Sequence, residues 1–250
     1  MVDTLGWRGK FGVITPSTNT VVQPEYDAIC PAGVTTHIGR MHIPDDPISS
    51  DGDFDELIRR IDVALEGAVK RVMTCKPDYF VLGISSESIW GGGLEKAQEI
   101  VKRMEPLLNG VQVSQAADAL PAALKAFGVK KKISVVTPYF PVAEPHIQQF
   151  AADIGYEIVK TYHMSCKSPT SIAHTSEDQC WEALRSVDSN EVEAIIQFGA
   201  NLPFAAVAAE AEKRLTKPIV AVNVATVWHA LRSFGIHDRI YGQGRLLWEY

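Results

Sequence analysis

The stretch FGVITPSTNT, from Phe11 to Thr20, begins with apolar residues and ends in small hydroxyl residues around Pro16 and Asn19. A second stretch, ISVVTPY from Ile133 to Tyr139, has the same order: an apolar run, Thr-Pro and a polar residue. Short apolar runs without alternation are typical of strands that are buried on both faces in a parallel sheet. The chain therefore contains the same kind of strand ending twice, and this repeat suggests how the fold is organised.

Strand-length apolar runs alternate with amphipathic segments of helical length along the whole chain. The predicted strands are Phe11–Thr15, Thr36–His42, Tyr79–Ile84, Val111–Ser114, Ile133–Thr137, Tyr156–Thr161, Ala194–Phe198 and Ile219–Val222. The predicted helices are Phe54–Met73, Glu95–Leu107, Ala116–Phe127, Ala143–Ile154, Glu177–Val187, Pro203–Leu215 and Val224–Phe234. Unbroken apolar strands separated by helices form parallel sheets covered on both faces, with right-handed crossovers. The sequence therefore predicts an α/β fold.

Two further pairs of segments extend the repeat. DYFVLGISS (78–86) and EAIIQFGAN (193–201) each join an acidic residue, an apolar strand and a small-residue turn. ALKAFGV (123–129) and ALRSFGI (230–236) are both helix ends with a terminating glycine. The three pairs occur in the same order, although chance similarity among α/β units is an alternative explanation.

The repeat predicts two duplicated Rossmann-like halves with parallel sheets, related by a pseudo-twofold, with the active-site cleft between them. The first half is expected to span residues 1–114 and to be completed by residues 223–250. The second half is expected to span residues 115–222.

Composition limits the partners that the protein can have. The net charge of -6 argues against nucleic acid as the main partner. No apolar stretch approaches the length of a membrane span, and the N-terminal MVDTLGWRGK lacks the apolar region of a signal peptide. We predict a cytoplasmic homo-oligomer without membrane contact.

Metal and nucleotide motifs are missing from the sequence. The four cysteines, Cys30, Cys75, Cys166 and Cys180, have no CxxC spacing, and the histidines have no HExxH spacing. The sequence also lacks the GxGxxG turn of dinucleotide sites and the GxxxxGKS/T loop of nucleoside triphosphate sites. We therefore predict free thiols, no metal and no other cofactor.

Polar residues follow four predicted strands at the point where each strand ends. They are Ser17, Thr18, Asn19, Ser85, Ser86, Tyr139 and Asn201, together with backbone N–H groups around Gly83 and Gly199. Ligands of open α/β sheets bind beyond the carboxyl ends of the strands, so we expect these ends to meet in one cleft. Hydroxyls and backbone amides at helix N-termini favour an anion, such as a carboxylate or a carbanion held as an enediolate.

Taken in order, these motifs resemble the aspartate/glutamate racemase superfamily, in the branch that holds maleate cis-trans isomerases and arylmalonate decarboxylases. The resemblance covers nearly the whole chain. It rests on TPSTNT (15–20), the turn at 83–86, VVTPY (135–139), the turn at 199–203, PIVAVNVATVWHALRSFG (218–235) and YGQGRLL (241–247). It implies a cofactor-free enzyme of two duplicated halves that holds a small carboxylate in the central cleft.

The resemblance also implies roles for single residues. Asn19 matches the asparagine that holds a substrate carboxylate in the isomerases, and Tyr139 matches a tyrosine that hydrogen-bonds a carboxylate. Ser85 matches a serine of the decarboxylases' oxyanion pocket, while Ile84 stands where those enzymes carry threonine. The backbone of Gly199–Ala200 matches the opposing anion-binding turn.

The chain departs from the family at the reactive thiols. Racemases and isomerases of the superfamily use two cysteines, one from each half, and decarboxylases keep only the second. The matching positions here are Gly83 and Gly199, and glycine can neither add to an alkene nor carry a proton as a thiolate does. Cys166 is the one cysteine in a loop that could approach the cleft. Another substrate-binding asparagine of the isomerases, expected near Ser168–Pro169, is also missing.

Three functions remain open at this point. The first is a cofactor-independent isomerase, decarboxylase or other lyase acting on a small carboxylate or dicarboxylate. The second is a hydrolase in which Ser85, Ser86 or a water held by Glu87 attacks a carbonyl. The candidate bases from other loops are His146, His163 and His174. The third is a non-catalytic carboxylate-binding protein.

The site residues follow from these hypotheses. The predicted catalytic residues are Ser85, Ser86, Glu87 and Tyr139, and the predicted substrate-binding residues are Ser17, Thr18, Asn19, Gly83, Gly199, Ala200 and Asn201. Several of these residues also have a structural explanation, because serine and asparagine are favoured at helix N-caps.

Overall fold

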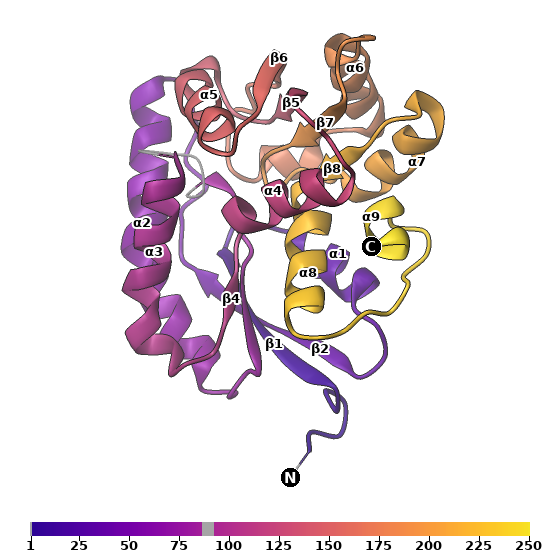
Figure 1. The fold of residues 1–250 in the computed structure, drawn as a ribbon. Helices are drawn as coiled ribbons and strands as arrows, with labels where there is room; N and C mark the ends of the chain where they lie inside the picture. The colour runs from indigo at the N-terminus through magenta and orange to yellow at the C-terminus, as the bar shows by residue number, and fades with distance from the viewer. Residues whose placement is uncertain (1, 87–92) are drawn as a thin grey trace.

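A computed structural model describes residues 2–86 and 93–250 and contains two parallel sheets of four strands each. The first sheet has the order β2-β1-β3-β4, formed by β1 (Gly9–Pro16), β2 (Val34–Met41), β3 (Tyr79–Leu82) and β4 (Val113–Ser114). The second has the order β6-β5-β7-β8, formed by β5 (Lys132–Thr137), β6 (Glu157–His163), β7 (Ala194–Gln197) and β8 (Ile219–Ala221). The second order repeats the first with the numbers raised by four, which confirms the predicted fold class. Figure 1 shows the strands with helices around them.

All eight predicted strands are present. The two Thr-Pro strands hold equivalent places, because β1 pairs with β2 and β3, and β5 pairs with β6 and β7. Each is therefore an inner strand, buried between neighbours. The last predicted strand ends one residue early, since Val222 already begins a helix.

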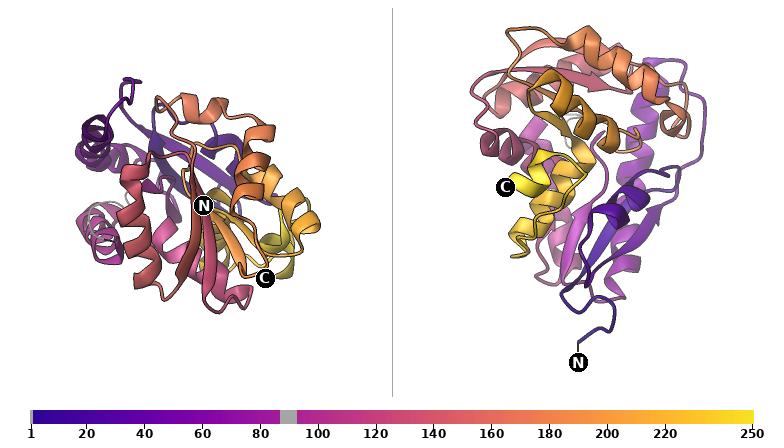
Figure 2. Two further views of the ribbon diagram at one scale, coloured as in Figure 1. Left: turned by 90° about the horizontal axis from the view of Figure 1, so that it is seen from above. Right: turned by 90° about the vertical axis from the view of Figure 1, so that its right-hand side faces the viewer.

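Helices lie between the strands and cover both sheets. They are α1 (Val22–Ile29), α2 (Asp51–Met73), α3 (Gly93–Leu108), α4 (Ala116–Ala126), α5 (Glu144–Asp153), α6 (Glu177–Val187), α7 (Ala205–Leu215), α8 (Val222–Ser233) and α9 (Arg245–Glu249). Two short 3-10 helices span Pro141–Ala143 and Ser171–His174. Helices α2 and α3 pack side by side along one flank of the molecule (Figures 1 and 2).

The seven predicted helices are present, and the sequence interpretation missed α1 and α9. Helix α1 contains Pro24, which reads as a helix breaker. Proline is tolerated in the first turn of a helix, where N–H groups have no partner within the helix. A side chain upstream of the helix supplies a partner for the first of these N–H groups, as described below.

Alternate residues of the inner strands face two different apolar cores. Val13 and Val81 belong to the larger core, which also holds residues of the second sheet and of α8. Ile14 and Leu82 belong to a second core, formed with α2 and α3. This period of two places α2 on one face of the first sheet and α8 on the other.

Helix α8 follows the second sheet in the chain but packs on β3 and β4 of the first sheet. Phe234, directly after α8, meets Phe11 of β1 edge to face, with ring centroids 5.4 Å apart. The core of the first sheet is therefore completed by residues from near the end of the sequence. The exact limits of the two halves, 1–114 with 223–250 and 115–222, stay a prediction.

None of the helices in the described ranges has the length and apolar character that crossing a bilayer would require. The cytoplasmic location and the homo-oligomeric state stay predictions.

Candidate active site

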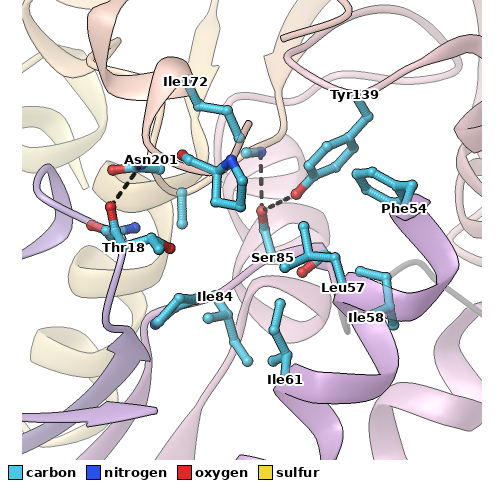
Figure 3. A pocket seen from close by; sticks show the side chains of 16 residues that line it. Thr18, Phe54, Leu57, Ile58, Ile61, Ile84, Ser85, Tyr139, Ile172 and Asn201 are labelled. Atoms are coloured by element: carbon cyan, nitrogen blue, oxygen red, sulfur yellow. Dashed lines mark hydrogen bonds between the residues drawn. The ribbon is translucent and has the colours of Figure 1, made fainter. Parts of the chain in front are cut away.

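A cavity of about 60 Å³ lies where the carboxyl ends of strands from both sheets meet (Figure 3). We call it the central pocket. It is lined by Pro16, Thr18, Asn19, Phe54, Leu57, Ile58, Ile61, Ile84, Ser85, Ser86, Tyr139, Pro169, Ile172, Gly199, Ala200 and Asn201. The loops after β1, β3, β5 and β7 all contribute, so the structure brings the four predicted strand ends together.

Ser85 is the centre of the polar side of the pocket. Its side chain is 1% exposed, and its Oγ accepts a hydrogen bond from the N–H of Gly199 at 3.0 Å. The same Oγ lies 3.2 Å from the hydroxyl oxygen of Tyr139 (Figure 3). Ser85 follows the first sheet while Gly199 and Tyr139 follow the second, so these contacts exist only when the two sheets are docked.

The Gly199–Asn201 turn forms the opposite wall. Gly199 has φ +97°, a conformation that residues other than glycine rarely adopt. A Cβ at this position would lie 2.3 and 2.4 Å from ring carbons of Pro138. Within the described part of the chain, the backbone N–H groups of Ala200 and Asn201 donate no hydrogen bond, so they are available to an anion.

The Asn201 side chain connects three loops. Its Oδ1 accepts from the N–H of Thr20 at 2.9 Å, and its Nδ2 donates to the carbonyls of Pro169 at 2.8 Å and Thr18 at 3.4 Å. Because the whole amide is occupied, ligand binding by Asn201 has to use its backbone N–H. The prediction that Asn201 binds substrate therefore applies only to its backbone N–H group.

Asn19 hydrogen-bonds the start of α1 and also lines the central pocket, and its role in substrate binding stays a prediction. Its Oδ1 accepts from the N–H groups of Val21 at 3.0 Å and Val22 at 2.9 Å, and so satisfies the first N–H group of α1 and the one before it. Among the described residues its Nδ2 has no acceptor, and the side chain lines the pocket. An Arg40 guanidinium nitrogen donates to the Asn19 carbonyl oxygen and holds the loop in place.

One wall of the pocket is apolar, and the sequence interpretation missed it. Phe54, Leu57, Ile58 and Ile61 point from α2 into the cavity (Figure 3). Their spacing of three and four residues is that of one helix face, so the pattern was visible, but the sequence does not say what this face covers. Residues 84 and 172, both isoleucine, complete the apolar lining.

The other predicted site residues are placed differently. Ser17 lies outside the pocket lining and exchanges two hydrogen bonds with the backbone of Ile43, at 2.9 and 3.1 Å. Gly83 also lies behind the lining, and its N–H donates to the Ile14 carbonyl at 2.8 Å. Ser86 lines the pocket, whereas Glu87 lies outside the described residues.

Ionisable acids and bases are missing from the described lining. None of the aspartates, glutamates, histidines, lysines or arginines that the structure describes lines the pocket, including the candidate bases His146 and His174. His163 is also elsewhere, with its Nε2 2.9 Å from a carboxylate oxygen of Glu144. A serine nucleophile needs a base within reach, and the described residues provide none for Ser85. The same residues contain no group of three His, Cys, Asp or Glu side chains that could hold a metal ion.

The cysteines of the described chain do not line the pocket, and their pKa values are raised, which disfavours the thiolate form. Of the described lining residues none is a cysteine. Burial raises the pKa of both Cys30 and Cys180 to about 12, and it also raises the pKa values of Cys75 and Cys166. Cys166 lines a separate hollow, with its Sγ 3.8 Å from the hydroxyl of Thr175.

Comparison with known proteins places this geometry in a family. The sequence profile of the arylmalonate decarboxylase family matches residues 12–247. The maleate isomerase of Alcaligenes faecalis is 23% identical over 95% of this chain and 96% of its own length.

Two solved structures have the same fold. A variant of the maleate cis-trans isomerase of Nocardia farcinica, with a covalently bound succinylcysteine intermediate, superposes with a TM-score of 0.82 at 21% identity, over 96% of this chain and 98% of its own. An arylmalonate decarboxylase superposes with a TM-score of 0.72 at 18% identity, over 95% of this chain and 98% of its own. With a profile match over nearly the whole sequence, this chain belongs to the arylmalonate decarboxylase family.

Proposed function

We propose that the chain is a cofactor-independent decarboxylase of small malonate-type acids that stabilises an enediolate in the central pocket. The observation that carries the proposal is the contact of Ser85 with Tyr139 and Gly199. It joins two hydroxyls and a backbone N–H in a buried site whose described lining is uncharged. Fixed donors in such a site stabilise the charge that develops in a transition state more strongly than water does.

The proposed reaction balances without a cofactor. A malonate-type acid loses one carboxylate as CO2, and the electron pair of the broken C–C bond enters the remaining carboxylate to form an enediolate. Since Ser85 Oγ accepts from Gly199, its own proton is directed to Tyr139 or to an oxygen of the enediolate. Because the described lining holds no ionisable acid, a water molecule that enters the pocket donates the proton to the α-carbon and leaves as hydroxide, which gives the monocarboxylate.

The apolar wall supports a substrate that carries an apolar substituent. With its carboxylate on the donors around Ser85, an aryl or branched alkyl group would lie against Leu57, Ile58 and Ile61 of α2. Burying such a group contributes roughly 25 cal/mol per Å² of apolar surface removed from water. A second carboxylate at the same place would instead lose its hydration without a partner.

Maleate isomerisation is less well supported. The structure of the Nocardia farcinica isomerase contains a succinylcysteine, which needs a cysteine in contact with the substrate. In the described part of this chain the pocket lining holds no thiol. Decarboxylation needs only the stabilised enediolate and a proton.

A turnover screen followed by NMR tests the proposal. Phenylmalonate and maleate are incubated separately with the protein. We expect phenylmalonate to be converted to phenylacetate and CO2, and maleate to remain unchanged. Conversion of maleate to fumarate without any turnover of phenylmalonate would overturn the proposal, and turnover of neither acid would favour a carboxylate-binding protein.

The substitution Asn19→Asp separates the two roles of this residue. Aspartate keeps an oxygen that accepts from Val21 and Val22, so the melting temperature should change little. It removes the Nδ2 donor and adds a negative charge to the pocket. Because a hydrogen bond to a charged group is worth about 1.5–3 kcal/mol, we expect kcat/KM for phenylmalonate to fall about tenfold or more. Unchanged kinetics would remove Asn19 from the substrate-binding site.

The cysteines are expected to be dispensable. A variant in which Cys30, Cys75, Cys166 and Cys180 are replaced by alanine or serine should keep turnover within about tenfold, provided that it melts normally. A residue that transfers a proton typically accelerates the reaction by about 10²–10⁴-fold, so the loss of a catalytic cysteine would be easily distinguished from a change within tenfold. Collapse of activity in Cys166→Ala alone, at an unchanged melting temperature, would show that a relocated thiol takes part.

A further inference from the structure

Behind the Gly199–Asn201 turn lies a carboxylate that the proposed chemistry does not use. Glu25 projects from α1, and its Oε1 accepts from the N–H of Ala205 at 3.2 Å, at the start of α7. Its Oε2 accepts from Nδ2 of Asn223 at 2.7 Å, at the start of α8. In the described residues α7 has no side-chain cap of its own, so Glu25 caps the N-terminus of α7 and also binds a side chain from the first turn of α8.

Asn223 continues this contact to the turn. It is 3% exposed, and its Nδ2 also donates to the carbonyl oxygen of Ala200 at 2.9 Å. The two protons of this amide are therefore divided between Glu25 and Ala200. The result is a chain of contacts from α1 to the wall of the central pocket.

The contact with Ala200 determines how one peptide group is oriented. The carbonyl of Ala200 and the N–H of Asn201 belong to the same peptide unit, and the described chain has no cis peptide bonds. In a trans peptide the two groups point in opposite directions. Rotation of this unit changes ψ of Ala200 and φ of Asn201, and asparagine is among the non-glycine residues that best tolerate a positive φ. A rotated peptide would present a carbonyl oxygen, rather than an N–H, to a bound anion.

We propose that Glu25 and Asn223 are positioning residues that hold the Ala200–Asn201 peptide with its carbonyl away from the central pocket and its N–H toward the bound carboxylate. The inference rests on the proposed function for the nature of the anion, but the orientation of the peptide can be observed independently.

The raised pKa of Glu25 supports a functional role for a carboxylate at this place. Burial raises its pKa to about 7, even though the N–H groups of Asn223, Ala205 and Phe204 counteract the shift. A carboxylate with such a pKa is a cost to the folded state at neutral pH. Side chains with strongly shifted pKa values cluster at functional sites.

The test compares Glu25→Ala and Asn223→Ala with a matched control, Glu212→Ala. Glu212 lies on α7, is 5% exposed, has a pKa raised by burial and accepts from the N–H of Arg245 at 2.8 Å. Like Glu25, it is a carboxylate that accepts from a helix N-terminus and whose pKa is raised by burial, but it does not line the central pocket. Calorimetry measures the affinity of each protein for phenylacetate, and crystal structures give the orientation of the Ala200–Asn201 peptide.

We expect both Glu25→Ala and Asn223→Ala to bind phenylacetate about tenfold or more weakly, with the peptide rotated or present in two orientations. Glu212→Ala should keep the wild-type affinity and peptide orientation. Glu25→Gln should be intermediate, since its oxygen can accept from only one of the two donors.

Two results would overturn the inference: wild-type affinity in Glu25→Ala, or an equal loss of affinity in Glu25→Ala and Glu212→Ala. A wild-type protein that does not bind phenylacetate counts against the proposed function instead. The inference is then decided by the peptide orientation alone, and an unrotated peptide in both Glu25→Ala and Asn223→Ala would reject it.

Discussion

Replacing Ser85 by alanine should lower kcat/KM for phenylmalonate by about 10²–10³, the effect that removal of one oxyanion donor has in other enzymes. The loss is expected to be large because Ser85 contacts groups from the other sheet as well as the proposed substrate. Its Oγ is the acceptor for the N–H of Gly199 and the neighbour of the Tyr139 hydroxyl. Without it, a buried N–H loses its partner, at a cost of about 1–3 kcal/mol.

The variant Tyr139→Phe provides the comparison for this experiment. It removes one hydroxyl but keeps the hydrogen bond between Ser85 and Gly199. We expect a smaller decrease, about tenfold. A decrease in Tyr139→Phe that exceeds that of Ser85→Ala would move the centre of the site from the serine to the tyrosine.

Gly199→Ala is the second substitution with a large expected effect. The added Cβ would lie 2.3 Å from a ring carbon of Pro138, and the proline ring cannot rotate away. The φ of +97° adds backbone strain. Together, strain and overpacking should destabilise the fold by roughly 2–5 kcal/mol and distort the turn, measured by urea unfolding and by turnover.

Gly235→Ala is the matched control, because Gly235 has φ +90° but a Cβ added there would meet no atom within 4 Å. This variant should lose only about 1–2 kcal/mol and keep its activity. An equal loss of stability in both variants would show that the contact with Pro138 is unimportant. The same geometry predicts that Gly199→Cys cannot install a reactive thiol, since cysteine needs the same Cβ.

Local patterns in the sequence were sufficient to predict the strands and seven of the helices. The repeated Thr-Pro endings and the glycine turns fixed the edge of the sheets where the pocket would lie, because parallel strands end on the same side. Helix α1, which contains Pro24, was not predicted, and the contacts of the Asn19 side chain with the N–H groups of Val21 and Val22 at its start appear only in the structure.

The parts of the site that depend on distant contacts could not be predicted. The apolar face of α2 with Leu57 and Ile61 was visible as a periodic pattern. The cavity that it lines forms only where the two sheets pack together, and the sequence does not show this packing. Substrate binding by Asn201 stays a prediction, and the sequence did not show that its side-chain amide connects loops up to 183 residues apart. Glu25 was not considered at all, since its partner Asn223 is 198 residues away and no local pattern joins the two.

The packing of α8 against the first sheet has a consequence for biosynthesis. The loop after β1 leaves the ribosome early, but Asn223 follows Glu25 by 198 residues, which takes about 10–40 s at ordinary rates of translation. During that interval the face of the first sheet around Phe11 and Val81 lacks the helix that covers it in the finished protein. A nascent chain at this stage exposes apolar strands, and we expect chaperones to bind it. A circular permutant that places α8 before β1 would shorten this exposure, and it should fold with less aggregation.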